Sequence, residues 1–268
     1  MRKFFFALLL LPFASLGQDI TVFREIENQR IVLYAKNVAH FPYSITLELS
    51  LTNYLFSEGQ KKVFVIPPKS DRFKIGDLTK RNDKESSSYN YKYQSSIGDI
   101  TIVRYDSLYE YDLPFHRGES YKVIQGYNGT FSHQDENAID IAMPEGTKIV
   151  AAREGVVVRL VQNNTMSCPQ KECAKYNNYI TILHNDGTFG NYNHIKYNGS
   201  AVSLGDIVKK GSVIGYSGNV GWSSSPHLHF MVTVPAIGKW RSVETLFRTN
   251  SGDTKEILMQ GNTYARNY

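Results

Sequence analysis

Residues 223–230, SSSPHLHF, place two of the seven histidines of this chain one residue apart. In a β-strand, residues i and i+2 point to the same face, so the stretch predicts that His227 and His229 lie together while Leu228 and Phe230 face the opposite side. Pro226 fits the start of such a strand, where no ladder hydrogen bond is lost. Two imidazoles on one strand can serve one metal ion, or one metal ion and one reacting group. A pair of exposed strand histidines fits the motif equally well.

The sequence on either side of this stretch consists of alternating apolar runs that stop at glycines. Three examples are PEGTKIVAAREGVVV (144–158), HNDGTFGNYNHI (184–195) and SLGDIVKKGSVIGYSGNVG (203–221). Such punctuation is typical of short strands joined by tight turns. The second half of the chain is therefore predicted to form a compact antiparallel β-roll.

The first half also has the period of two that is typical of strands. In YSITLELSLTN (43–53), apolar residues alternate with Thr, Glu and Ser, and RIVLYAKN (30–37), KKVFVIPP (61–68) and SSYNYKYQ (87–94) are similar. We expect an all-β protein: a β-sandwich-like accessory domain over residues 18–112, a β-roll domain over 113–245, and a tail over 246–268 with a possible edge strand.

The amino terminus, MRKFFFALLLLPFASLGQDI, resembles a cleaved secretory signal over residues 1–17. Its apolar run is too short to span a bilayer, and no later stretch approaches twenty apolar residues, so no transmembrane segment is predicted. Removal of Arg2 and Lys3 lowers the formal charge from +5 to +3, and the remaining charges are interleaved, which argues against nucleic-acid binding. In an exported chain, Cys168 and Cys173, the only two cysteines, are expected to form a disulfide.

Two further polar residues interrupt predicted strands. In NAIDIAM (137–143), Ile139 and Ile141 face one way, while Asp140 shares its face with small alanines; an ionised carboxylate is rarely buried without a partner or a metal. In GNYNHI (190–195), Tyr192 and His194 are expected to share a strand face. Histidine and aspartate are ligands that a catalytic zinc takes, with three protein ligands and one open position.

These motifs together resemble the lysostaphin-type (LytM-like) zinc metallopeptidases of cell walls. The resemblance covers about residues 125–232 and rests on FSHQDENAID, YNH and HLHF in the same order and spacing. It implies a zinc ion held by His133, Asp140 and His229, with His194 and His227 as unligated catalytic residues.

One departure from the family pattern concerns the first ligand pair. Most members have HxxxD, whereas six residues separate His133 from Asp140 here, and Glu136 occupies a position closer to the aspartate. We keep His133 as the predicted ligand, with Glu136 as the alternative. His184 ends a predicted strand and is interpreted as structural, and His40 and His116 fall outside every motif.

The resemblance and the signal segment imply an exported zinc metalloendopeptidase, in the periplasm or outside the cell, that cuts peptide stems or cross-links of peptidoglycan. The alternative is a zinc-free LytM-like adaptor that binds and activates other wall hydrolases, but such adaptors lack several of the ligands that this chain keeps. A biotin or lipoyl carrier is disfavoured, because no lysine lies between apolar residues at a hairpin tip. The sequence predicts neither the bond that is cut nor the oligomeric state.

Overall fold

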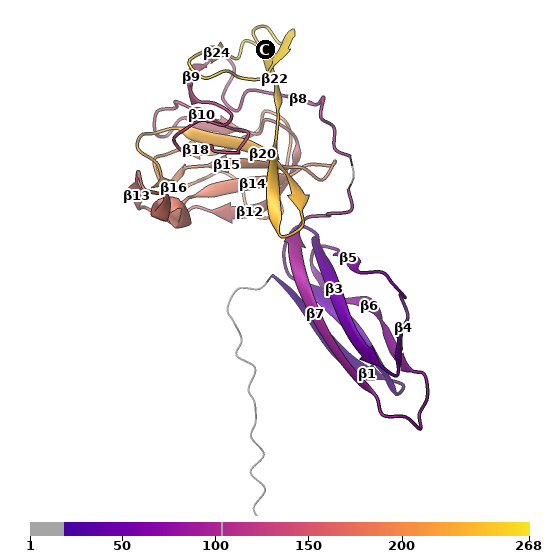
Figure 1. Cartoon of the computed structure of the whole chain (residues 1–268). Coiled ribbons are helices and arrows are strands. Elements are labelled where there is room, and N and C mark those ends of the chain that lie inside the picture. Colours follow the sequence, from indigo (N-terminus) through magenta and orange to yellow (C-terminus); the bar gives the residue numbers. More distant parts are fainter. Residues whose placement is uncertain (1–18, 103) are drawn as a thin grey trace, which may run out of the picture.

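The strands within residues 20–97 form two antiparallel sheets. The computed structural model describes residues 19–102 and 104–268, so the predicted signal segment lies outside the described residues. One sheet has the order β1 (Ile20–Glu27), β2 (Arg30–Asn37), β6 (Ser70–Lys80) and β4 (Tyr54–Phe56); the other has β5 (Val63–Ile66), β3 (Tyr43–Thr52) and β7 (Ser88–Ile97). Both sheets contribute to one apolar core, and we call strands β1–β7 the N-terminal sheet pair (Figure 1).

The remaining strands form a roll around a second core. Its main sheet has the order β17 (Ile207–Val208), β12 (Gly155–Val161), β14 (Tyr179–Leu183), β15 (Phe189–Asn193), β20 (Leu228–Ala236), β10 (Ala138–Ile141), β9 (Ser120–Gln125) and β24 (Thr263–Ala265), and β21 (Lys239–Val243) also pairs with β20. The second sheet has the order β11 (Lys148–Val150), β18 (Val213–Ser217) and β16 (Ile195–Ser200). Apolar side chains from both sheets meet in the core between them.

Shorter elements complete the roll. They are the parallel pair β13 (Ser167–Cys168) and β19 (Gly221–Trp222), the sheet β23 (Thr254–Glu256), β22 (Leu246–Thr249) and β8 (Glu110–Tyr111), and a 3₁₀ helix η1 (Lys171–Tyr176). The predicted all-β fold class is confirmed. Among the described residues, no helix is long and apolar enough to cross a membrane.

The register between β10 and β20 decides which side chains leave the core. Asp140 lies opposite His229, and Ile139 lies opposite Phe230. Ile139 and Phe230 belong to the roll's core, so the alternation sends Asp140 and His229 to the outer face of the main sheet.

Residues 246–268 contribute more to the roll than the predicted tail with a possible edge strand. Strand β24 lies at the edge of the main sheet beside β9, while β22 pairs in parallel with β8. Phe247, Leu258 and Tyr264 belong to the roll's core, and Arg266 forms a salt bridge with the buried Asp112 at 2.8 Å. The period-two pattern was too weak here to reveal them, because each strand is only three or four residues long.

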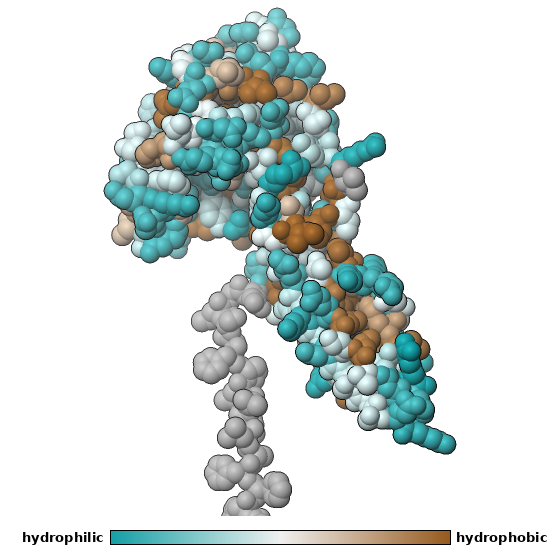
Figure 2. All heavy atoms as spheres, viewed as in Figure 1, coloured by the Kyte–Doolittle hydropathy of each residue, from teal (hydrophilic) through white to brown (hydrophobic). Residues whose placement is uncertain are grey.

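The N-terminal sheet pair packs on the outer face of the same main sheet, away from Asp140. Phe189 of β15 is fully buried, and its ring lies 6.2 Å from Phe41 and 4.8 Å from Trp240. At the tip of the β20–β21 hairpin, Gly238 donates a backbone hydrogen bond to Ser96 Oγ. Figure 1 shows this hairpin reaching the ends of β3 and β7, and Figure 2 shows hydrophobic residues at the junction.

We expect Phe189→Ala to lower the free energy of unfolding by about 3 to 5 kcal/mol, because it leaves a cavity between the N-terminal sheet pair and the roll. Denaturant unfolding measures this loss. Ile26→Ala is the control, because Ile26 is 79% exposed and its truncation should change stability by less than about 0.5 kcal/mol. A similar small change for Phe189→Ala would show that the junction contributes little.

A buried histidine gives the fold a pH dependence. His184 follows β14 at 3% exposure, and its Nδ1 lies 2.8 Å from the carbonyl oxygen of Glu154. Burial lowers the pKa of His184 from 6.5 to about 4. Between these values the unfolded chain binds the proton and the folded chain does not, so stability falls as the pH is lowered.

We expect this histidine to contribute a loss of roughly 3 kcal/mol as the pH falls from 7 to 4. His184→Asn keeps a donor for Glu154 without a titrating ring, so its unfolding free energy should fall less steeply over that range. The same substitution at the exposed His116 is the control. Equal pH slopes for wild type and His184→Asn would contradict the assignment.

Candidate metal centre and its groove

Three predicted ligands converge on the outer face of the main sheet. Asp140 Oδ1 lies 3.0 Å from His229 Nδ1 and 3.2 Å from His133 Nε2, and the two nitrogens are 3.1 Å apart. Ligands placed about 2.0–2.1 Å from a tetrahedral zinc are about 3.3 Å from each other. The triangle therefore has nearly the dimensions of one face of such a site, and these three residues form a group that could hold a metal ion.

Hydrogen bonds to the far sides of His133 and Asp140 select the atoms that face the ion. His133 Nδ1 lies 3.0 Å from the carbonyl oxygen of Gly126, which fixes its proton on Nδ1 and leaves Nε2 as a lone pair. Gln125 donates from Nε2 to Asp140 Oδ2 at 3.0 Å, so Oδ1 is left for the ion. Gln125 is itself held by hydrogen bonds with Phe131 and Ser132. The donor set thus fits a metal ion with its supporting contacts already in place.

The fit also resolves an electrostatic problem among the three ligands. Two nitrogen atoms and a carboxylate oxygen point at one another from side chains that are almost wholly buried. Burial raises the pKa of Asp140, but the contacts with His133 and His229 outweigh it and hold this pKa well below its usual range. The pKa of His133 is raised, because its contacts with Asp140 and Gly126 outweigh its burial. A cation bound by all three residues would compensate the negative charge of the Asp140 carboxylate.

The two histidines that were predicted as catalytic lie beside this centre. The rings of His194 and His227 are 4.5 Å apart, and His227 Nε2 lies 3.6 Å from Asp140 Oδ1. His194 Nδ1 lies 2.8 Å from the carbonyl oxygen of Val220, and His227 Nδ1 lies 2.7 Å from that of Ser225. Both rings therefore carry their proton on Nδ1 and keep Nε2 as an acceptor.

Burial keeps both of these rings neutral. Burial and the neighbouring rings of His227 and His229 lower the pKa of His194 to about 3. Burial also lowers the pKa of His227, although the charge of Asp140 opposes the shift. At neutral pH both rings are therefore neutral, and their Nε2 atoms can accept hydrogen bonds.

The centre lies at the floor of a groove of about 380 Å³. Its lining includes Asp140, His194, His227 and His229, and its walls are formed by residues 131–132, 174, 177 and 222–225. Phe131 is 56% exposed, and its ring lies 6.2 Å from that of Trp222. The groove is thus open to an extended ligand and has aromatic side chains on its rim.

One expectation about this site is wrong. Tyr192 and His194 were predicted to share a strand face, but β15 ends at Asn193 and His194 has a φ of +63°. Tyr192 is fully buried in the core, whereas His194 turns to the groove. Because His194 has a left-handed backbone conformation, the alternation of side chains ends at Asn193. The prediction assumed that this alternation continues through His194.

The other candidate residues lie outside the ligand triangle. Glu136 is exposed on the rim of the groove and does not belong to the converging group of described residues. His184 is buried behind the sheet beside Tyr111, His116 is exposed, and His40 packs near Gly205. Sequence reasoning missed Gln125, which lies opposite Asp140 across β9 and β10, because a polar residue at a strand end carries no signal of its own.

Known proteins are similar to the part of the chain that contains this site. Peptidase family M23 matches residues 134–241, and His133 directly precedes this segment. Lysostaphin of Staphylococcus simulans is 36% identical over 107 residues, which cover 39% of this chain and 18% of lysostaphin. The peptidoglycan DD-endopeptidase ShyA of Vibrio cholerae is 34% identical over 98 residues, 37% of this chain and 20% of ShyA.

A metalloprotease of Buchnera aphidicola without a characterised function is 38% identical over 103 residues, 38% of this chain and 24% of that protein. The chain therefore spans about a quarter or less of the length of these relatives. The solved catalytic domain of S. simulans lysostaphin is 25% identical, with a TM-score of 0.33, and the match covers 52% of this chain and 87% of that domain. Residues 134–241 thus match the model of peptidase family M23, in agreement with the resemblance to the lysostaphin-type metallopeptidases.

Proposed function

We propose that this protein is an exported zinc metalloendopeptidase that hydrolyses peptide bonds in the stems or cross-links of peptidoglycan. The observation that carries the proposal is the triangle of His133 Nε2, Asp140 Oδ1 and His229 Nδ1, with edges of 3.0 to 3.2 Å, at the floor of an open groove. Similarity to ShyA, a peptidoglycan DD-endopeptidase, supports this class of substrate.

His133, Asp140 and His229 would hold the zinc ion. When bound there, zinc supplies a Lewis acid that polarises the scissile carbonyl and lowers the pKa of a water molecule. Nitrogen and carboxylate ligands of this number are those of a catalytic zinc site with an open position. Gln125 and the carbonyl of Gly126 orient the ligands, so the site is organised before substrate enters.

His194 and His227 handle the proton in this proposal. The Nε2 atom of one ring accepts a proton from the attacking water and returns it to the leaving amine, and the other ring takes a proton from solvent on Nε2 and donates a hydrogen bond to the developing oxyanion. The carbonyls of Val220 and Ser225 hold the opposite nitrogens, so both rings present Nε2. With these roles for His194 and His227, no glutamate is needed as a general base.

Export and the domain division are part of the same proposal. The predicted signal over residues 1–17 and the disulfide between Cys168 and Cys173 are typical of an oxidising compartment outside the cytoplasm. We propose that residues 18–112 form an accessory domain, except for β8, which pairs with β22 in the roll, that residues 113–245 form the peptidase domain, and that residues 246–268 complete its fold.

The first test is the metal content of the purified protein. We expect about one zinc ion per chain in the wild type and loss of zinc in His229→Ala, together with loss of soluble fragments released from peptidoglycan. Asp140→Asn keeps the shape of the side chain and should give the same result, and His116→Ala, far from the groove, should keep zinc and activity. A metal-free wild type that still binds peptidoglycan or another wall hydrolase would favour the adaptor alternative.

The second test separates proton handling from metal binding. We expect His194→Ala and His227→Ala each to keep zinc but to lower kcat by roughly a hundredfold to ten-thousandfold, the range for loss of a general acid or base. Zinc content and initial rates measured on the same samples check this. If both variants lost zinc, the two histidines would have to be reassigned as ligands.

A further inference from the structure

The segment 219–225 supports both unligated histidines from outside the main sheet. Its Val220 carbonyl accepts from His194, and its Ser225 carbonyl accepts from His227. Ser223 Oγ lies 3.2 Å from His227 Nδ1 and within hydrogen-bond distance of Asn219 Oδ1 and the Ser225 carbonyl, one of which accepts its proton. Any displacement of this segment would therefore change where the two Nε2 atoms point.

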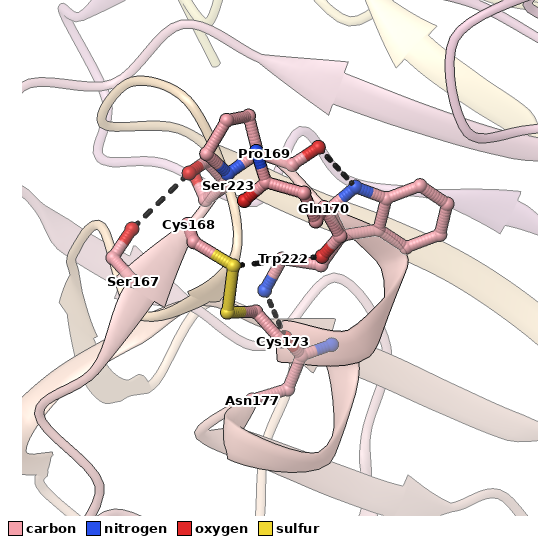
Figure 3. The surroundings of a disulfide bond; sticks show 8 residues. All are labelled: Ser167, Cys168, Pro169, Gln170, Cys173, Asn177, Trp222 and Ser223. Carbon is pink, nitrogen blue, oxygen red and sulfur yellow. Dashed lines mark hydrogen bonds between the residues drawn. A yellow bond between two sulfur atoms is a disulfide. The ribbon is translucent and has the colours of Figure 1, made fainter.

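A neighbouring strand fixes the backbone of this segment. Strand β13 pairs in parallel with β19, with Ser167 opposite Gly221 and Cys168 opposite Trp222. Gly221 N donates to the carbonyl of Met166 at 2.8 Å, and Ser223 N donates to that of Cys168 at 3.1 Å. Ser167 Oγ donates in turn to the Ser223 carbonyl at 3.1 Å (Figure 3).

The loop closed by the disulfide holds Trp222 from two directions. The indole Nε1 donates to the carbonyl of Pro169 at 3.0 Å, and the backbone N of Trp222 donates to Asn177 Oδ1 at 2.9 Å (Figure 3). Gly221 has a φ of +92°, and a Cβ there would lie 1.8 Å from Asn177 Oδ1. The segments that carry these two residues are therefore in direct contact. Trp222, Asn177 and Ala174 also line the groove.

The loop between Cys168 and Cys173 buries few apolar side chains that could stabilise its conformation. Residues 169–172, 174 and 175 are exposed, and in η1 only Cys173 is buried. A segment with few buried apolar contacts opens at low free-energy cost. The covalent bond between Cys168 and Cys173 is therefore the main local restraint on the chain that carries β13.

We propose that the Cys168–Cys173 disulfide is a positioning element for the reaction: it holds β13 and η1 against segment 219–225, and through that segment it orients His194 and His227 and sets Trp222 in the groove wall. The inference rests on the proposed function, because it gives these histidines their role in turnover. Neither cysteine belongs to the converging group of His133, Asp140 and His229, so the effect of the disulfide on the metal should be small.

The test compares Cys168→Ser/Cys173→Ser with the wild type on soluble cross-linked muropeptides. We expect zinc content to stay unchanged while kcat falls by roughly tenfold to a hundredfold, as for loss of outer contacts that orient reacting groups. Reduction of the wild type with a phosphine reductant, which lacks the zinc-chelating thiols of dithiothreitol, should lower kcat similarly, and reoxidation should restore it. Lys171→Ala, an exposed change inside the closed loop, should keep the wild-type kcat.

A second measurement does not depend on activity. Trp222 and Trp240 are the only tryptophans, so Trp240→Phe leaves Trp222 as the single fluorophore. In that background, removal of the disulfide should shift its emission to the red and increase its quenching by acrylamide. An inactive, zinc-free wild type would refute the proposed function, while this measurement would still report on the loop.

A purely stabilising disulfide would give a different result. In that case the cysteine variant would unfold at a lower temperature but would keep its kcat and Trp222 emission at temperatures where it is folded. That outcome, or a loss of zinc equal to the loss of activity, would overturn the proposal.

Discussion

The pairing of Asp140 with His229 across β10 and β20 is the constraint on which the groove depends. Side chains alternate along both strands, so the register that buries Ile139 against Phe230 also sets a carboxylate and an imidazole side by side on the outer face. A slip by one residue would bury the ligands and expose the core. The free energy of apolar burial thus fixes the position of the polar site, and the site needs no separate device to bring these two ligands together.

The remaining imidazoles are held by backbone carbonyls, and this choice of partner matters chemically. A carbonyl accepts a hydrogen bond from Nδ1 and carries no net charge, so it fixes the orientation of His194 and His227, while burial still outweighs its effect and keeps the pKa of both rings lowered. Asp140 then remains the main negative charge among the groups that converge there. One charged ligand and neutral rings suit a divalent cation, while two unligated acceptors stay available for protons.

The sequence predicted the parts of this arrangement that follow from alternation and from motif order. AID and the LHF of HLHF were assigned to strands with the correct faces, because their apolar neighbours obey a period of two; His227 directly precedes its strand. The prediction from the sequence failed where the backbone departs from the strand conformation, as at His194. It also failed where a contact joins distant segments, as between Gln125 and Asp140. The η1 helix and the support of segment 219–225 by β13 were equally invisible, because neither has an apolar pattern.

The outer face of the main sheet also explains how the N-terminal sheet pair relates to the groove. At one end this face carries Asp140 and His229; at the other, Phe189 and Trp240 are covered by the sheet pair. A hydrogen-bonded row of Thr181, Asn191 and Thr233 lies between them. The described residues that line the groove all come from 124–231, so the sheet pair does not cover it. It instead anchors the hairpin that begins with the strand of His229, and a fixed hairpin keeps the register with β10 on which the ligand triangle depends.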